Sequence, residues 1–292
     1  MPKLIISAPF FNTTEKDLLK TFEILAKSNA DEILLRDVSC QKREPSIEFY
    51  KKTIKLLHDN GKKIILNTPL IVRQEDKVFN KFSNLVDIVE INNIGYLPFL
   101  KNTKTILGPQ LRMYNCEDSK IFEDSKFERF VVPYGLTKEQ TQELLHEIKH
   151  EGEVFIFGLE SVALSWDCFL ASFLEKNRHN CQKACFNHAS GLNISSLNSI
   201  PLFKTMGTEV FSQKAYSIIN QIDYLKKNGV NHFRANPHLI FEKSQLGKRI
   251  NDLKEIIESN KNTENFWWLE KCNGTFYEKT PGYEYVGDKK CL

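Results

Sequence analysis

Long apolar runs are missing from this sequence of 292 residues. No segment reaches the roughly 18 consecutive apolar residues that a membrane-spanning helix needs. The first 17 residues contain only a short apolar stretch that ends at Asn12, without the extended apolar core and small-residue cleavage site of a secretory leader. The sequence therefore predicts a cytoplasmic protein with no membrane span.

A surplus of charge of one sign is also absent. The chain has 40 basic and 37 acidic residues, and its formal net charge is +3. Proteins that bind nucleic acid usually carry a basic face or stripe, which this balance does not provide. We therefore do not expect a nucleic-acid partner.

The short motifs of several large enzyme classes are missing as well. The sequence has no phosphate-binding P-loop, no glycine-rich dinucleotide motif after a strand, no nucleophile-elbow motif and no H-E-x-x-H pair. Phosphoryl transfer, hydride transfer from a nicotinamide and serine hydrolysis therefore have no support in the sequence.

What the sequence does contain is a regular alternation of short apolar runs with amphipathic runs, which is typical of βαβ units. A capping box at Thr137 and Gln140 predicts the start of one of the helices. Eight runs are expected to be strands, at residues 4–6, 32–36, 63–67, 86–91, 105–108, 129–133, 154–157 and 232–235. This pattern predicts an α/β fold, a (β/α) TIM-like barrel in complete or irregular form.

We expect one barrel-like domain over residues 1–292. Residues 186–210 are rich in Asn, Ser and Gly and predict a loop that folds over the cysteine-bearing segment. A helix is expected over residues 215–225. Residues 262–292 are aromatic and rich in turn-forming residues, which predicts a tail packed on the domain.

Cysteines are the most informative residues. The chain has seven, an odd number without a regular pairing pattern, which argues against a secreted disulfide framework. Cys168, Cys181 and Cys185 form a C-x12-C-x3-C run that follows the seventh predicted strand. Cys40 follows the second. In barrels the carboxyl ends of the strands carry the chemistry, so Cys40 is our candidate for a fourth ligand.

Three readings of these cysteines stay open on the residues alone. Four thiolates can hold an iron–sulfur cluster, the same ligands can hold a structural zinc, or separate buried cysteines can pack as small hydrophobic groups. His179 and His188 flank the run and are alternative ligands or solvated loop residues. Basic residues nearby either offset the charge of a thiolate-bound cluster or are ordinary surface charge; they are Lys42, Arg43 and Arg178.

Glu160 is the one candidate for a catalytic acid or base. It follows the seventh predicted strand, where a barrel enzyme places such groups, but a lone carboxylate is a weak signal. No other catalytic residue is indicated.

These motifs resemble those of the collagenase-like peptidase family, and within it the UbiV-type branch. The core signature is Gly158, the run Ala163–Cys168, and then Cys181 and Cys185. The features of the branch are Cys40 followed by Lys42 and Arg43, the pair Tyr114-Asn115, and Cys272-Asn273-Gly274 before Phe276 and Tyr277.

The resemblance implies a 4Fe-4S cluster held by Cys40, Cys168, Cys181 and Cys185. It also implies a heterodimer with a UbiU-like family member, which hydroxylates the ring of a ubiquinone precursor without O2. The quinone precursor would be delivered by a lipid-binding protein. Peptidase activity is not what this branch implies.

Two other functions stay open. One is RNA base hydroxylation by a member of the same family, and the other is a non-catalytic scaffold partner that binds a structural zinc. One position departs from the family pattern: Asp167 stands where a basic residue more often precedes the first cysteine of the run. This departure leaves the ligands in place and bears on the reaction.

Overall fold

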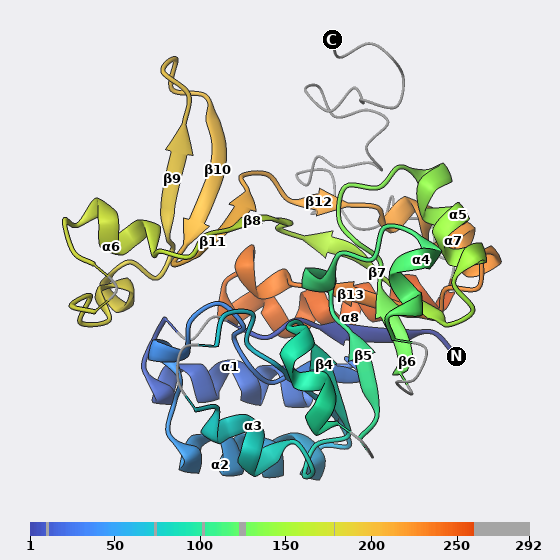
Figure 1. Ribbon diagram of the computed structural model, residues 1–292, viewed down its shortest axis with the longest axis horizontal. Coiled ribbons are helices and arrows are strands. Elements are labelled where there is room, and N and C mark those ends of the chain that lie inside the picture. Colours follow the sequence, from blue (N-terminus) through green and yellow to red (C-terminus); the bar gives the residue numbers. More distant parts are fainter. Residues whose placement is uncertain (10–11, 73–74, 101–102, 123–126, 178, 260–292) are drawn as a thin grey trace.

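The computed structural model describes residues 1–9, 12–72, 75–100, 103–122, 127–177 and 179–259. Eight parallel strands close into a barrel, because the last of them pairs with both the first and the seventh (Figure 1). The TIM-like barrel and all eight predicted strands are thereby confirmed. In order around the barrel the strands are β1 (Lys3–Ile6), β2 (Glu32–Leu34), β3 (Lys63–Asn67), β4 (Ile88–Ile91), β5 (Thr105–Leu107), β6 (Phe127–Val131), β7 (Glu151–Gly158) and β13 (His232–Ala235).

Helices surround the barrel. Thr14 caps the first by accepting a hydrogen bond from the backbone of Asp17, and the predicted capping box of Thr137 and Gln140 is present at the fifth. In chain order they are α1 (Glu15–Lys27), α2 (Ile47–Asp59), α3 (Lys77–Phe82), α4 (Cys116–Lys120), α5 (Lys138–Glu147), α6 (Phe169–Phe173), α7 (Ile222–Lys227) and α8 (Lys243–Ser259). None of the helices in the described ranges is long and apolar enough to span a bilayer.

Alternation along the strands divides the core in two. In β1, Leu4 and Ile6 join the large cluster packed under the helices, whereas Ile5 belongs to a separate small cluster. Successive side chains of a strand point to opposite faces, so the small cluster lies inside the barrel. Its members are Ile5, Leu34, Ile65, Ile88, Ile106 and Val131.

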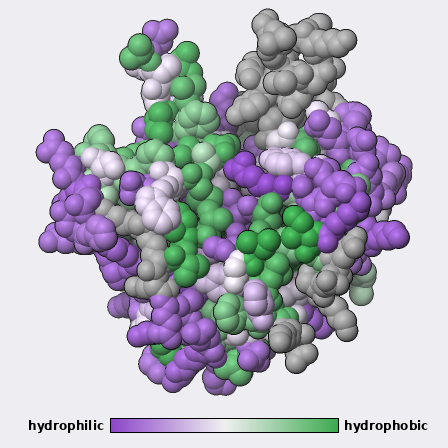
Figure 2. Space-filling model, in the orientation of Figure 1, coloured by the Kyte–Doolittle hydropathy of each residue, from purple (hydrophilic) through white to green (hydrophobic). Residues whose placement is uncertain are grey.

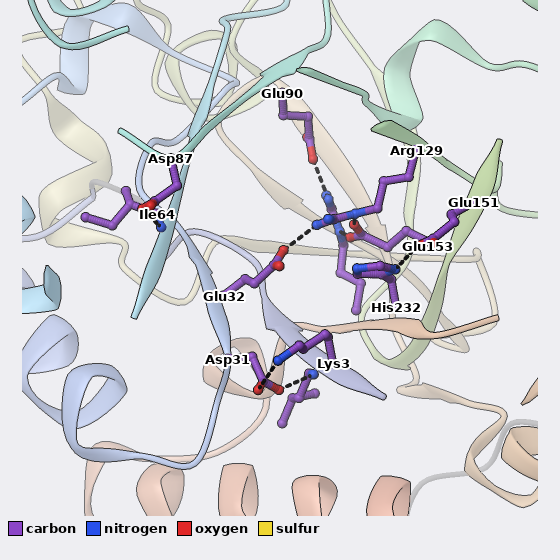
Figure 3. A network of polar contacts seen from close by, with 12 residues as sticks. Lys3, Asp31, Glu32, Ile64, Asp87, Glu90, Arg129, Glu151, Glu153 and His232 are labelled. Carbon is purple, nitrogen blue, oxygen red and sulfur yellow. Dashed lines mark hydrogen bonds and ion pairs between the residues drawn. The ribbon is translucent and has the colours of Figure 1, made fainter. Parts of the chain in front are cut away.

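The barrel interior also contains a network of charged side chains (Figure 3). Arg129 binds Glu32 and Glu153, and Arg234 binds Glu153 and Glu90. The Nε atom of Arg129 lies 2.7 Å from Glu153. All five side chains are at most 3% exposed, and they connect β2, β4, β6, β7 and β13 across the barrel. We call this set the interior ion chain.

A second sheet stands outside the barrel. It is antiparallel, in the order β8-β11-β10-β9, and β9 with β10 rises as a hairpin above the barrel (Figure 1). Its strands are β8 (Ser161–Leu164), β9 (Leu192–Ser195), β10 (Pro201–Met206) and β11 (Glu209–Ser212). The predicted loop over residues 186–210 is therefore wrong. Strand β9 has no buried face, so its sequence, which contains exposed Asn and Ser residues, lacks the alternating apolar pattern that predicts a strand.

The helix expected over residues 215–225 is shorter than predicted. Tyr216 and Ser217 form the strand β12 (Tyr216–Ser217), which pairs with Gly158 and Phe157 of β7, and α7 begins only at Ile222. Phe157 and Gly158 lie beyond the part of β7 that pairs with β6, and pairing with them satisfies backbone groups of β12 that a helix would otherwise bond internally. The predicted tail over residues 262–292 lies outside the described residues.

Candidate metal centre

The four predicted ligand cysteines line one pocket near the carboxyl ends of the barrel strands. Cys40 comes from the segment after β2 and precedes a 3-10 turn over Gln41–Arg43. Cys168 caps α6, where its Sγ atom accepts a hydrogen bond from the backbone of Ala171 at 3.4 Å. Cys181 and Cys185 come from the following turn. Residues 128 positions apart in sequence, Cys40 and Cys168, thus border the same space.

A buried cation borders the same pocket. The Nη2 atom of Arg43 lies 2.5 Å from the carboxylate of Asp37 and 2.6 Å from the hydroxyl of Ser39. Burial opposes the charge of the guanidinium, but Asp37 and the nearby thiols of Cys40, Cys185 and Cys168 raise the pKa of Arg43 overall. Arg43 therefore supplies positive charge where four thiolates would gather.

The thiols also act on one another. Burial raises the pKa of Cys185, Arg43 lowers it, and the other three cysteines raise it further. Four thiolates this close repel each other, so their ionised form calls for a bound cation or cationic cluster. Soft thiolates favour soft metals and iron–sulfur clusters. The donor set and the charge of Arg43 fit a four-iron cluster.

The turn between β10 and β11 covers this pocket. The hydroxyl of Thr208 donates to the carbonyl of Ser39 at 2.9 Å, and the carbonyl of Gly207 accepts from the backbone of Phe169 at 2.9 Å. Gly207 has a φ of +77°, and the guanidinium of Arg43 lies about 3.5 Å from the position of an added Cβ. The turn therefore fastens the Cys40 segment to the Cys168 segment.

A second network fixes the segment that carries Cys40. Arg36 follows β2 and is 1% exposed. Its guanidinium lies 2.5 Å from Glu44 and 2.7 Å from Asp76, and it joins the Cys40 segment to α3, which Asp76 caps. The hydroxyls of Tyr50 and Tyr96 donate to the same two carboxylates. The network makes the position of Cys40 depend on α2 and α3.

A separate cavity opens at the mouth of the barrel. Its volume is about 580 Å³, including space open to solvent, and its floor contains Glu90 and Arg234 of the interior ion chain. Asp37 lines this cavity and pairs with Arg43, which lines the cysteine pocket. The Asp37–Arg43 ion pair therefore links the linings of the two spaces.

The model of peptidase family U32 matches residues 18–265. The chain belongs to peptidase family U32. The matched range contains seven of the eight barrel strands, all but β1. It also contains all four cysteines of the pocket.

Among curated relatives of this U32 chain is the uncharacterized protease MJ0090 of Methanocaldococcus jannaschii. The two are 30% identical over 142 residues, which cover 44% of this chain and 34% of the relative. The chain thus spans about a third of the length of this relative.

Two solved structures are similar to this chain at low sequence identity. An uncharacterized B. cereus protein has a TM-score of 0.48 at 13% identity, with 86% of this chain and 65% of that chain covered. The U32 peptidase Mk0906 has a TM-score of 0.47 at 12% identity, with 81% of this chain and 92% of that chain covered.

The other residues selected from the sequence of this U32 chain lie as follows. Lys42 lines the cysteine pocket, whereas His179 and His188 are not among the residues that line it. Arg178 lies outside the described residues. Glu160 is buried between β7 and β8, and its charge raises the pKa of the neighbouring Tyr216, on which burial has the larger effect. Among the described side chains, no three His, Cys, Asp or Glu converge tightly enough to share a single metal ion.

Sequence reasoning missed Glu209. This carboxylate lies in β11, is 5% exposed and lines the barrel mouth. Burial raises its pKa to about 7; Ser161 and Arg43 oppose the rise and Asp37 adds to it. The signal that could have found it is a glutamate next to Gly207-Thr208, at the start of an apolar strand.

Proposed function

We propose that this U32 chain is a UbiV-type iron–sulfur protein that acts in O2-independent hydroxylation of a ubiquinone precursor. The observation that carries the proposal is the pocket shared by Cys40, Cys168, Cys181 and Cys185, with Arg43 beside it. A bound 4Fe-4S cluster would supply electron transfer at the carboxyl end of the barrel. The chain's own residues would hold it, offset its charge and separate it from the barrel mouth.

Arg43 and the turn at Gly207 have distinct roles in this proposal. Arg43 offsets thiolate charge and holds Asp37, so that the wall between the two cavities keeps its shape. The turn covers the pocket and limits access of water and O2 from that side. Both effects favour a retained cluster, because burial and nearby charge set the properties of iron–sulfur centres.

The proposed partner is a UbiU-like family member. Support comes from the β9–β10 hairpin, whose exposed apolar side chains form part of the hydrophobic surface in Figure 2. They include Leu197, Ile200 and Leu202, which are 105%, 57% and 45% exposed. Large exposed apolar groups on a projecting element are typical of a protein interface. Trp267 and Trp268, also expected at this interface, lie outside the described residues.

A deletion strain tests the proposed reaction. Loss of the gene should abolish ubiquinone made without oxygen and leave ubiquinone made with oxygen unchanged. The Cys168→Ala variant should fail to restore it, and the Cys116→Ala variant, altered outside the cysteine pocket, should restore it. Unchanged anaerobic quinone together with a missing modified base in RNA would instead support RNA base hydroxylation. Stoichiometric zinc without iron or sulfide would support the scaffold function.

A further inference from the structure

The turn between β10 and β11 (Figure 1) is fastened over the cysteine pocket at three points. Two of the bonds come from the residues on either side of Cys168, and the third reaches the residue before Cys40. They run from the N–H of Ser165 to the carbonyl of Thr208 at 2.8 Å, from the N–H of Phe169 to the carbonyl of Gly207 at 2.9 Å, and from the hydroxyl of Thr208 to the carbonyl of Ser39 at 2.9 Å. Because Gly207 and Thr208 line the pocket, the turn uncovers the thiols only when these bonds break.

Glu209 follows this turn directly and begins β11. Its side chain is 5% exposed, is hydrogen-bonded to Ser161 and lines the barrel mouth. In the outer sheet Glu209 lies opposite Met206 of β10 and Leu164 of β8. Since Glu209 is joined to Thr208, a shift that brings its carboxyl fully into water also moves the turn.

The surroundings of Glu209 suit a protonated carboxyl. Burial raises its pKa to about 7; the hydrogen bond from Ser161 opposes the rise, Asp37 adds to it, and Arg43 opposes it least. The charge of Arg43 is already matched by Asp37, 2.5 Å away. An ionised Glu209 would therefore lie beside a second carboxylate and a guanidinium that this carboxylate already neutralises.

Other ionisable groups of the barrel mouth keep their charge between pH 5.5 and pH 8.5. Burial raises the pKa of Tyr134, and Glu209 adds to the rise, so the phenol stays protonated. Burial lowers the pKa of His238 to about 4, so the imidazole stays neutral. Arg36 and Arg234 are held in buried ion pairs. A change of charge at Glu209 near neutral pH is therefore not offset by these groups.

Closure of the turn and protonation of Glu209 favour each other. In the closed arrangement the pKa is about 7, whereas a hydrated carboxyl has its ordinary value of 4.5. The closed form thus holds a proton that an open form releases. Opening becomes easier as the pH rises from about 4.5, by up to about tenfold per pH unit, and it levels off above about pH 7.

We propose that the turn at Gly207 and Thr208 is a pH-gated cover of the cysteine pocket, shut while Glu209 is protonated and released when Glu209 ionises. Acidification then closes the pocket over its contents, and neutral pH admits small reagents to the thiols. The inference assigns a regulation to the site of the proposed function and rests on that proposal for the identity of the bound group. The cover itself requires only the cysteines.

Thiol labelling of the full chain after iron removal tests the cover. The chain reacts with N-ethylmaleimide at pH 5.5, 6.5, 7.5 and 8.5, and peptide mass spectrometry gives a rate for each cysteine. Dividing the parent's rate by that of Glu209→Gln cancels the ordinary effect of pH on a thiol. For Cys40 and Cys168 this ratio should rise about fivefold or more from pH 5.5 to pH 7.5 and change little above it. For Cys116, in α4, it should stay constant.

A second pair of variants tests the fastening of the turn without changing Glu209. Thr208→Val removes the hydroxyl that bonds to Ser39, and it should speed labelling of Cys168 about threefold or more at pH 5.5. Thr205→Val is the matched control, because Thr205 is 2% exposed in β10 and its hydroxyl has no hydrogen-bond partner among the described residues. It should leave the rate unchanged. Thermal unfolding checks that each variant is folded, and this pair decides if Glu209→Gln is not.

Three results would overturn the proposal. A ratio that stays constant between pH 5.5 and pH 7.5 would show that Glu209 does not control the turn. Labelling of Thr208→Val no faster than that of Thr205→Val would show that the turn does not cover the thiols. A parallel rise at Cys116 would show that the whole barrel opens. Iron and acid-labile sulfide in protein purified without oxygen test the proposed function separately.

Discussion

Arg43 is the residue at which the two cavities meet. Its guanidinium borders the cysteine pocket, and its partner Asp37 borders the barrel mouth. Removing one member of a buried ion pair leaves the other charge without compensation, which costs about 3–5 kcal/mol. Arg43→Gln should therefore lower the free energy of unfolding by about this amount, as measured by urea titration of iron-free protein.

Lys42→Gln is the matched control for Arg43→Gln, because Lys42 is an exposed neighbour on the same turn. Its unfolding free energy should stay within about 0.5 kcal/mol of the parent. Equal effects of the two changes would mean that the Arg43–Asp37 pair is not a buried structural element.

The four pocket cysteines should be equivalent in holding iron. Protein purified without oxygen should be brown and contain about four irons per chain. Replacing Cys40, Cys168, Cys181 or Cys185 by Ala should deplete iron and acid-labile sulfide, whereas Cys116→Ala should leave both unchanged. Full iron content in the Cys40→Ala variant would show that Cys40 is not a ligand. His179 or His188 would then be the candidate for the fourth ligand.

Glu209 gives a pH-dependent stability of definite sign. Burial raises its pKa to about 7 from an ordinary 4.5, so between these values the folded chain holds a proton that the unfolded chain has released. Its contribution is complete below about pH 4.5 and is lost as pH rises through 7. Glu209→Gln should be more stable than the parent at pH 8.5, by on the order of 3 kcal/mol.

The difference between Glu209→Gln and the parent should shrink toward zero near pH 5, where Glu209 is neutral in the folded chain. Urea titrations at the two pH values measure it. A difference that grows as pH falls would contradict the buried, protonated carboxyl.

At the scale of elements, the β9–β10 hairpin is the part of the described chain best placed to bind a partner. Leu197→Asp with Ile200→Asp should weaken the proposed heterodimer at least tenfold, because both side chains are more than half exposed and would be desolvated on binding. Size-exclusion chromatography of co-expressed proteins at micromolar concentration measures it. Lys52→Glu on α2 should not change elution, and an unaffected complex in the hairpin variant would exclude this surface.

The elements of the barrel were predictable because their signals are local. Strand β1 contains an unbroken apolar run, and Thr14 and Thr137 cap helices by accepting hydrogen bonds from backbone N–H groups three residues later. The outer sheet was not predictable in this way. Its strands pair with each other, and β9 is largely exposed, so residues such as Asn193 and Ser195 follow no burial pattern.

At the scale of the whole molecule, the interior ion chain holds the two halves of the barrel together. Glu153 accepts from both Arg129 and Arg234, and these arginines lower its pKa to about 2 although burial opposes them. Glu153→Gln leaves two buried guanidinium groups without this partner, and it should destabilise the fold by about 3–5 kcal/mol in urea titration.

Exposed Glu128, next to Arg129 on the outer face of β6, is the control for Glu153. Glu128→Gln should cost less than about 1 kcal/mol, because it breaks only a surface pair with Lys104. The stability due to Glu153 should be present above pH 4.5 and be lost as pH falls through about 2. A parent whose stability does not fall between pH 4 and pH 2 would contradict this.

The candidate site was predictable only in part, for a reason that belongs to the whole molecule. The position of Cys40 and of the three later cysteines after strand ends follows from sequence, since parallel strands bring their carboxyl ends to one side. The composition of the barrel mouth does not follow from the sequence in this way. Its charged residues, among them Glu90 and Arg234, occupy inward positions of apolar strands, and their partners are set by barrel closure.

Barrel closure also sets an order of events during translation. Strand β1 leaves the ribosome before β13, and it can complete its pairing only after β13 has emerged, more than 200 residues later. At about 5–20 residues per second, a nascent chain spends ten seconds or more with an open sheet edge. For most of that interval Cys40 has been synthesised and Cys185 has not. Assembly of a metal centre on all four cysteines therefore follows the synthesis of Cys185, and a chaperone that shields the open edge of β1 during this interval would raise the yield of folded protein.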